Sequence, residues 1–140
     1  MCMTMKLHYD VSGDDFTRAG EASGNVKAKL KRLGISSEAV RRAAIALYEG
    51  EIYLVIHAGG GEIDVEISPE NIKMTLSDEG PGIADVEKAM TEGYSTATEN
   101  IRSLGFGAGM GLPNMKKYTD IMDIKSTLGV GTTIFMQINL

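Results

Sequence analysis

Asp78 is the first residue in the chain whose position suggests chemistry, because it ends an alternating apolar segment. Counting back by twos from it reaches Leu76, Met74 and Ile72, so its carboxylate should lie on the apolar face of that strand. A desolvated carboxylate needs hydrogen-bond donors, and the amino group of a ligand is one source of them. The alternative is a turn aspartate that accepts from the backbone amides just after it.

A second candidate is a loop in which glycines alternate with other residues directly before Leu112 and Pro113. Its glycines are Gly105, Gly107, Gly109 and Gly111. A side-chain-free loop that runs into a helix start suits phosphate, because the first helical amides are unpaired. No Lys-Ser or Lys-Thr follows the glycines, so the loop is not a P-loop. A flexible hinge is the alternative interpretation.

Thr132 and one helical stripe complete the candidates. Thr132 follows the turn 129–131 and shares its parity with Ile134, so its hydroxyl should point inward, near Asp78. The alternative is an ordinary hairpin with a strand-favouring Thr pair. Glu49, Tyr53 and His57 recur at intervals of four on one face of an otherwise apolar helix. That face could line a ligand cavity, with Glu49 as a general base. The alternatives are a solvated glutamate and a hydrogen-bonded histidine near the helix end.

The elements that position these residues follow from hydrophobic periodicity. The pattern predicts a strand at 7–11, helices at 15–33 and 36–58, a hairpin of 62–67 and 72–76, a short helix at 85–92, a glycine-rich lid at 93–108, a helix at 113–118, and strands at 120–126 and 132–140. This order predicts an α/β two-layer sandwich, in which helices cover one face of a mixed, mostly antiparallel sheet. We expect residues 1–140 to form a single domain.

Composition excludes several classes of function. The chain has 140 residues, enough to bury roughly 68–70% of its unfolded surface, and its net charge of −5 argues against a nucleic-acid partner. Apolar runs fall short of the ~20 residues of a membrane span, and the start has no signal-peptide core, so we expect a cytoplasmic protein. Cys2 is the only cysteine and cannot form an internal disulfide.

With these residues in order, the chain resembles the GHKL superfamily of ATP-binding proteins, whose fold is the Bergerat fold. Within it, the chain is similar to the small bacterial serine kinases that regulate sigma factors by partner switching. The stretches Ala89-Met90, Gly93-Tyr94-Ser95-Thr96 and Gly109-Met110-Gly111-Leu112-Pro113 carry the similarity to switch kinases. The resemblance covers nearly the whole chain and implies ATP and Mg²⁺ as cofactors.

The resemblance also implies roles for individual residues. Asp78 would accept the adenine amino group, and Glu49 would align or deprotonate a substrate serine. The other cofactor-binding positions would be Gly80, Gly82, Gly105, Gly107, Gly109, Met110, Gly111, Leu112 and Thr132. One position departs from the family pattern: Tyr53 stands where an Asn usually helps to hold Mg²⁺, and a phenol is a poor ligand for that ion.

Three functions are consistent with this sequence. The first is an ATP-dependent serine kinase that phosphorylates a STAS-domain antagonist, with a sigma factor or a downstream phosphatase as further partners and a homodimer as its assembly. The second is an ATP-binding anti-sigma factor or regulatory module with weak or no kinase activity, because of Tyr53. The third is a nucleotide-independent scaffold, which would leave the family's motifs around Glu49, Asp78, Gly105 to Gly111 and Thr132 without a purpose.

Overall fold

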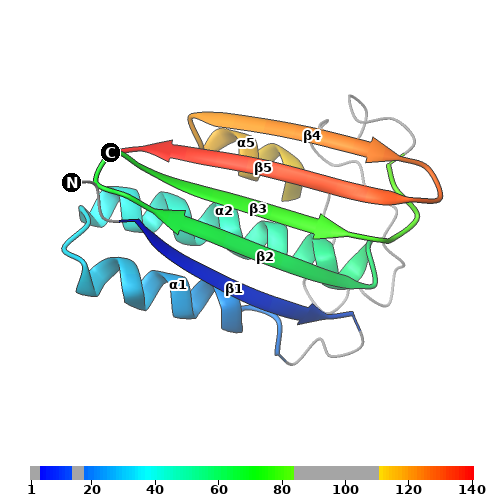
Figure 1. Cartoon of the computed structure of the whole chain (residues 1–140), viewed down its shortest axis with the longest axis horizontal. Helices are drawn as coiled ribbons and strands as arrows, with labels where there is room; N and C mark the ends of the chain where they lie inside the picture. The colour runs from blue at the N-terminus through cyan, green and yellow to red at the C-terminus, as the bar shows by residue number, and fades with distance from the viewer. Residues whose placement is uncertain (1–3, 14–17, 84–110) are drawn as a thin grey trace.

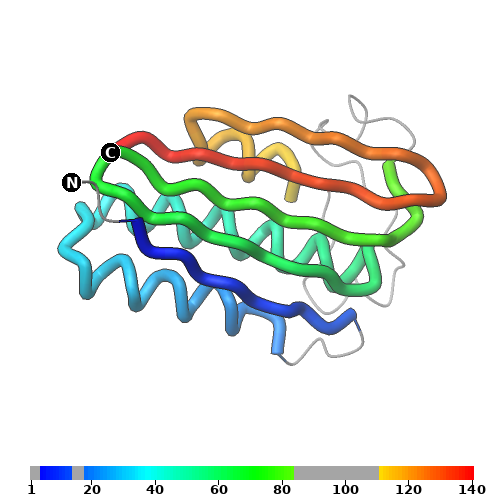
Figure 2. The backbone as a smooth tube through the Cα atoms, viewed as in Figure 1, coloured from blue at the N-terminus to red at the C-terminus, as the bar shows by residue number. Residues whose placement is uncertain are grey.

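The computed structural model describes residues 4–13, 18–83 and 111–140. Figures 1 and 2 show a twisted sheet with helices packed along one side. In chain order the elements are β1 (Met5–Ser12), α1 (Glu21–Arg32), α2 (Ser37–Ile56), β2 (Gly60–Ile67), β3 (Asn71–Asp78), α5 (Gly111–Lys117), β4 (Ile121–Thr127) and β5 (Gly131–Asn139). The predicted helix at 85–92 and the predicted lid at 93–108 lie outside the described residues.

The five described strands form one sheet in the order β1-β2-β3-β5-β4. All four pairings are antiparallel, which confirms the predicted sheet and makes it more regular than the mixed one expected. The last strand therefore lies between β3 and β4. This insertion brings the end of β3 beside the start of β5, where Asp78 is paired with Thr132.

One face of the sheet carries the core, because buried and more exposed residues alternate along the strands. The central strands place Ile63, Val65, Ile72, Met74, Leu76, Ile134, Met136 and Ile138 on that face, all almost fully buried. Helix α2 packs on this face and contacts α1 and α5 as well (Figure 1). The predicted two-layer sandwich with helices on one face is confirmed, and α2 is its central helix.

Helix α1 begins at Glu21, six residues later than the predicted start at 15. The cause is Gly20, whose φ of 103° lies in the left-handed region and ends any helix before it. The amides of Ala22 and Ser23 then donate to Oε2 and Oε1 of Glu51 on α2, at 3.2 Å and 3.0 Å. Glu51 is only 2% exposed. A buried carboxylate from one helix thus caps the N-terminus of its neighbour.

Candidate functional site

The carboxylate of Asp78 is half-buried and is held by two backbone amides. Its Oδ1 accepts from the Gly80 amide at 2.9 Å and from the Thr132 amide at 3.2 Å. Burial is the largest influence and raises the pKa of Asp78, while the two amide hydrogen bonds act in the opposite direction. The turn interpretation is confirmed, because the side chain accepts from a turn amide. The side chain also lies beside Thr132, and its contact with a ligand amino group stays a prediction.

The side chain of Thr132 belongs to a hydroxyl cluster next to Asp78. Thr132 is 2% exposed, and its hydroxyl lies 2.8 Å from that of Ser126 on β4. The Ser126 hydroxyl also accepts from the amide of Ile83, at 2.7 Å, which ties the segment after Asp78 to the sheet. Sequence reasoning missed Ser126, although its place opposite Thr132 across the turn could have indicated it.

Tyr53 extends this cluster from α2. Its side chain is 9% exposed, and burial, the main cause, raises the pKa of its hydroxyl. A hydrogen bond with Thr132 has the opposite effect on that pKa, and the nearby charge of Asp78 raises it further. The phenol therefore points toward the Asp78 and Thr132 end of the sheet. The ring centroid of His57 lies 5.7 Å from that of Tyr53, and burial lowers the pKa of His57.

Gly80 and Gly82 are required by the packing of the backbone itself. A Cβ on Gly80 would lie 2.8 Å from the carbonyl oxygen of Ala58, at the end of α2. Gly82 has a φ of 81°, and a Cβ there would lie 2.6 Å from the carbonyl oxygen of Thr127. These two glycines let the turn after β3 fit between α2 and the β4–β5 hairpin. Their predicted contact with adenine stays a prediction.

Glu49 is partly exposed and lies beside the start of α5. Its Oε1 accepts from Nδ2 of Asn114 at 3.3 Å, and a Cβ on Gly111 would lie 3.6 Å from its Oε2. Leu112 is buried in the core. The structure thus brings the predicted base next to the described end of the predicted phosphate loop. Gly105, Gly107, Gly109 and Met110 lie outside the described residues, so their predicted role is not tested.

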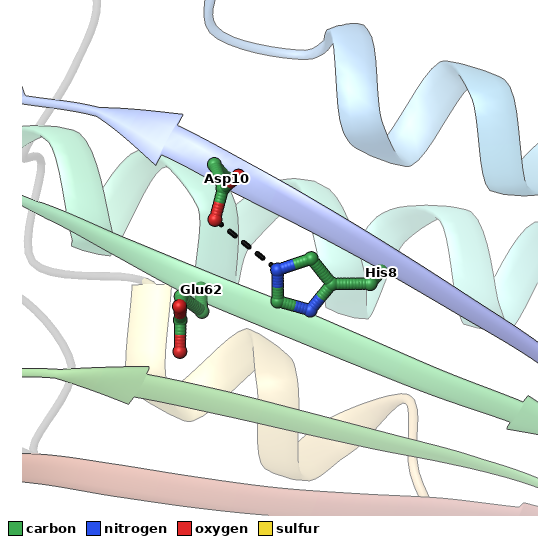
Figure 3. Close-up of side chains that lie close together, drawn as sticks. All are labelled: His8, Asp10 and Glu62. Carbon is green, nitrogen blue, oxygen red and sulfur yellow. Dashed lines mark hydrogen bonds and ion pairs between the residues drawn. The ribbon is translucent and has the colours of Figure 1, made fainter.

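The open face of the sheet carries a separate polar cluster around His8 (Figure 3). Its Nδ1 lies 2.7 Å from Asp64 and its Nε2 lies 3.1 Å from Asp10, with Glu62 close by. Hydrogen bonds with these two aspartates, Asp64 first, raise the pKa of His8. Both ring nitrogens of His8 thus lie within hydrogen-bond distance of a carboxylate. We interpret the cluster as a network of hydrogen bonds and ion pairs on the exposed face of the sheet.

The fold and this arrangement define a class of ATP-binding domain. Residues 37–140 match the family described as Histidine kinase-, DNA gyrase B-, and HSP90-like ATPase, and the chain belongs to that family. The family resemblance predicted from the sequence is confirmed, and membership implies the use of ATP. Within the described residues, no helix combines the length and apolar character needed to cross a membrane.

Individual relatives narrow the class. The chain is 32% identical over 124 residues to serine/threonine-protein kinase RsbT of Bacillus subtilis (strain 168), covering 86% of this chain and 85% of that protein. It is 37% identical over 100 residues to the anti-sigma F factor of Thermoanaerobacter sp. (strain X514), covering 71% of this chain and 62% of that protein, less than two thirds of its length. The solved structure of the mycobacterial sensor histidine kinase MprB shares the fold, with a TM-score of 0.55 at 15% identity over 96% of this chain and 97% of that one.

Proposed function

We propose that the protein is an ATP-dependent serine kinase that phosphorylates a STAS-domain antagonist in a partner-switching module of the cytoplasm. A sigma factor or a downstream phosphatase would be a further partner, and a homodimer the assembly. The observation that carries the proposal is the Asp78 carboxylate, half-buried at the sheet end with both amide hydrogen bonds on Oδ1. The similarity to RsbT over most of both chains supports it.

The residues at the sheet end fit an adenine. In the proposal, Oδ2 of Asp78 accepts the exocyclic amino group, since Oδ1 already accepts two amides. The hydroxyls of Thr132 and Ser126, 2.8 Å apart, supply further donors and acceptors beside it. The burial that raises the pKa of Asp78 also strengthens a hydrogen bond to its ionised form. A Cβ on Gly80 would lie 3.1 Å from Oδ1 of Asp78, so this glycine keeps a side chain away from the carboxylate.

The phosphate end of the proposed site lies at the start of α5. ATP supplies the transferable phosphoryl group when it is bound, and the loop from Gly105 to Leu112, with Met110 in it, is proposed to surround it. Glu49 would accept the proton of the substrate serine hydroxyl as the serine oxygen bonds to the γ-phosphorus of ATP, while the bond from that phosphorus to the β–γ bridging oxygen breaks and ADP leaves. The amide of Asn114 holds one oxygen of Glu49 at 3.3 Å, which leaves the other for the serine.

Tyr53 does not fit as a ligand of Mg²⁺. Its hydroxyl is buried and hydrogen-bonds with Thr132, its pKa is raised, and a neutral phenol is a weak donor for this ion. We therefore propose that the ion is held by nucleotide and water oxygens, and we derive no catalytic step through it. The same observation favours a second function, an ATP-binding anti-sigma factor or regulatory module in which phosphoryl transfer is weak or lost.

A transfer assay distinguishes the two functions. The purified protein is incubated with γ-labelled ATP, Mg²⁺ and the STAS-domain protein encoded nearest to it, with Glu49→Gln as the matched variant. Label that appears on a serine of the STAS protein with the wild type, and not with Glu49→Gln, supports the kinase. ATP binding by calorimetry without any transfer would favour the regulatory module, and the absence of ATP binding would refute both.

A further inference from the structure

A groove runs between α1 and α2 on the helical side of the molecule. It has a volume of about 420 Å³ and is lined by Lys27 and Lys31 of α1, Ile35 of the connection, and Ser37, Val40, Arg41, Ala44 and Ile45 of α2. Its apolar part consists of partly exposed side chains over the buried Val40. Its rim carries three cations. The groove therefore offers both an apolar floor and a positive edge.

The charge around this groove is opposite to that of the whole protein. Residues 27–42 contain six basic side chains and one acidic, a net charge of +5, whereas the entire chain has a net charge of −5. In the part of the chain that the structure describes, Lys27 and Lys31 take part in no ion pair. Arg41 lies over the ring of Tyr118, at 5.7 Å. These cations are available to an external anion.

The groove is far from the proposed nucleotide site. The C-terminal end of α1 and the N-terminal end of α2 lie at the end of the molecule where the chain termini are marked (Figure 1). Asp78, at the tip of β3, and Thr132, at the start of β5, lie at the opposite end of the sheet. The groove residues are therefore not part of the site already described.

We propose that this groove docks an acidic amphipathic helix of a partner protein. Apolar side chains at positions i, i+3 or i+4, and i+7 of that helix would cover Ala44 and Ile45, while flanking carboxylates would face Lys27, Lys31 and Arg41. The residues that line the groove include no aromatic side chain on which a base could stack, so the aliphatic floor favours a peptide over a nucleic acid. This inference goes beyond the proposed function and does not depend on phosphoryl transfer.

The test is a selection from a displayed library of random 16-residue peptides on the wild-type protein. Enriched peptides are expected to be acidic, with apolar residues at helical spacing. Synthetic versions should bind the Lys27→Glu/Lys31→Glu variant at least 10-fold more weakly than the wild type. The matched control, Lys73→Glu/Lys125→Glu, makes the same change of charge on the open sheet face and should alter binding less than 2-fold. Ala44→Gln, which places an amide over the floor, should weaken binding about 5-fold or more.

Several outcomes would overturn the proposal. If basic or neutral peptides are enriched, or no peptide is, the proposal that the groove binds an acidic partner is wrong. Equal losses in the two charge-reversal variants would show a non-specific field effect. Tighter groove-dependent binding of a 20-nucleotide single strand would assign the groove to nucleic acid, and self-association that disappears in Lys27→Glu/Lys31→Glu would assign it to a second copy. Circular dichroism of each variant checks that it is folded.

Discussion

Replacing Asp78 by Asn changes a single oxygen into an NH₂ group. The amide oxygen of Asn can accept from Gly80 and Thr132 as Oδ1 does now, at 2.9 Å and 3.2 Å, so the local turn should persist. At the position of Oδ2, a charged acceptor is replaced by an NH₂ donor, which would face the amino group of adenine, itself a donor. The variant therefore isolates the contact that the proposed function requires.

The expected magnitude follows from the loss of a hydrogen bond to a charged acceptor. Such a bond contributes about 1.5–3 kcal/mol, which corresponds to a roughly 10- to 150-fold weaker affinity for ATP. Inosine triphosphate carries an oxygen where ATP carries the amino group. The wild type should discriminate strongly against it, and Asp78→Asn, with an NH₂ group at that position, should discriminate much less.

Although Asp78→Asn should weaken ATP binding, it should maintain or raise the stability of the protein. Burial raises the pKa of Asp78 in the folded protein, so its ionised form costs stability, and this cost develops as the pH rises through the folded pKa. Asp78→Asn should therefore unfold at an equal or higher temperature than the wild type at pH 7. The difference should vanish below the pKa of the unfolded carboxyl, near 3.8, where both side chains are neutral.

Calorimetry with both nucleotides, and thermal unfolding between pH 3 and pH 7, measure these effects. Equal ATP affinity in wild type and variant would refute the adenine assignment. Unchanged discrimination against inosine triphosphate would refute the geometry even if the affinity falls. A variant that is less stable at pH 7 would show that the charge of Asp78 stabilises the turn, contrary to the sign argued here.

Three further results are expected. Tyr53→Asn should lower the stability of the protein by about 3 kcal/mol, because it opens a cavity, yet raise Mg²⁺-dependent phosphorylation roughly 10-fold. Adding Glu49→Ala to this variant should abolish the gain in rate. Equal rates in the wild type and Tyr53→Asn would show that an active kinase tolerates Tyr53. Asn114→Ala should lower the rate of phosphoryl transfer with little change in ATP affinity, because Asn114 positions Glu49. If calorimetry shows that ATP affinity falls as much as the transfer rate, Asn114 does not act by positioning Glu49. His8→Gln should destabilise the protein more at pH 5.5 than at pH 8.5 in denaturant unfolding. The reason is that the contribution of His8 to the free energy of unfolding is fully present below about pH 6.5 and is lost as the pH rises through its raised folded pKa. A loss of stability that does not depend on pH would show that the charge of His8 is not involved.

The inward direction of Thr132, toward the same sheet end as Asp78, was accessible to sequence analysis because strand parity is local. Each residue follows the alternation of its own strand, and the predicted inward direction of Thr132 is confirmed. The departure at Tyr53 was also visible, because the family that the sequence resembles usually has an Asn at this position. What spacing could not show is where the phenol points, which depends on the position of Thr132 in a strand more than 70 residues later.

Sequence analysis missed one contact between distant elements and one contact across a hairpin. The hydrogen bond between Asn114 and Glu49 joins residues 65 positions apart, and no local pattern pairs them. Ser126 looked like an ordinary strand residue until the β4–β5 pairing placed it opposite Thr132. The start of α1 was predicted too early because apolar spacing continues through residue 16, whereas the backbone at Gly20 prevents a continuous helix.

The cap that Glu51 provides to α1 limits where the chain can be shortened or fused in an experiment. The family match covers residues 37–140, while the similarity to RsbT covers 86% of this chain and the likeness to the MprB structure covers 96% of it. Helix α1 and strand β1 precede the segment that matches the family. Yet Glu51, inside that segment, finds its two amide donors only on α1. A chain shortened to begin at Ser37 would leave the buried carboxylate of Glu51 without these two donors and would expose the side of α2 that packs against α1. In this protein, heterologous fusions or domain exchanges should therefore keep β1 and α1 together with residues 37–140.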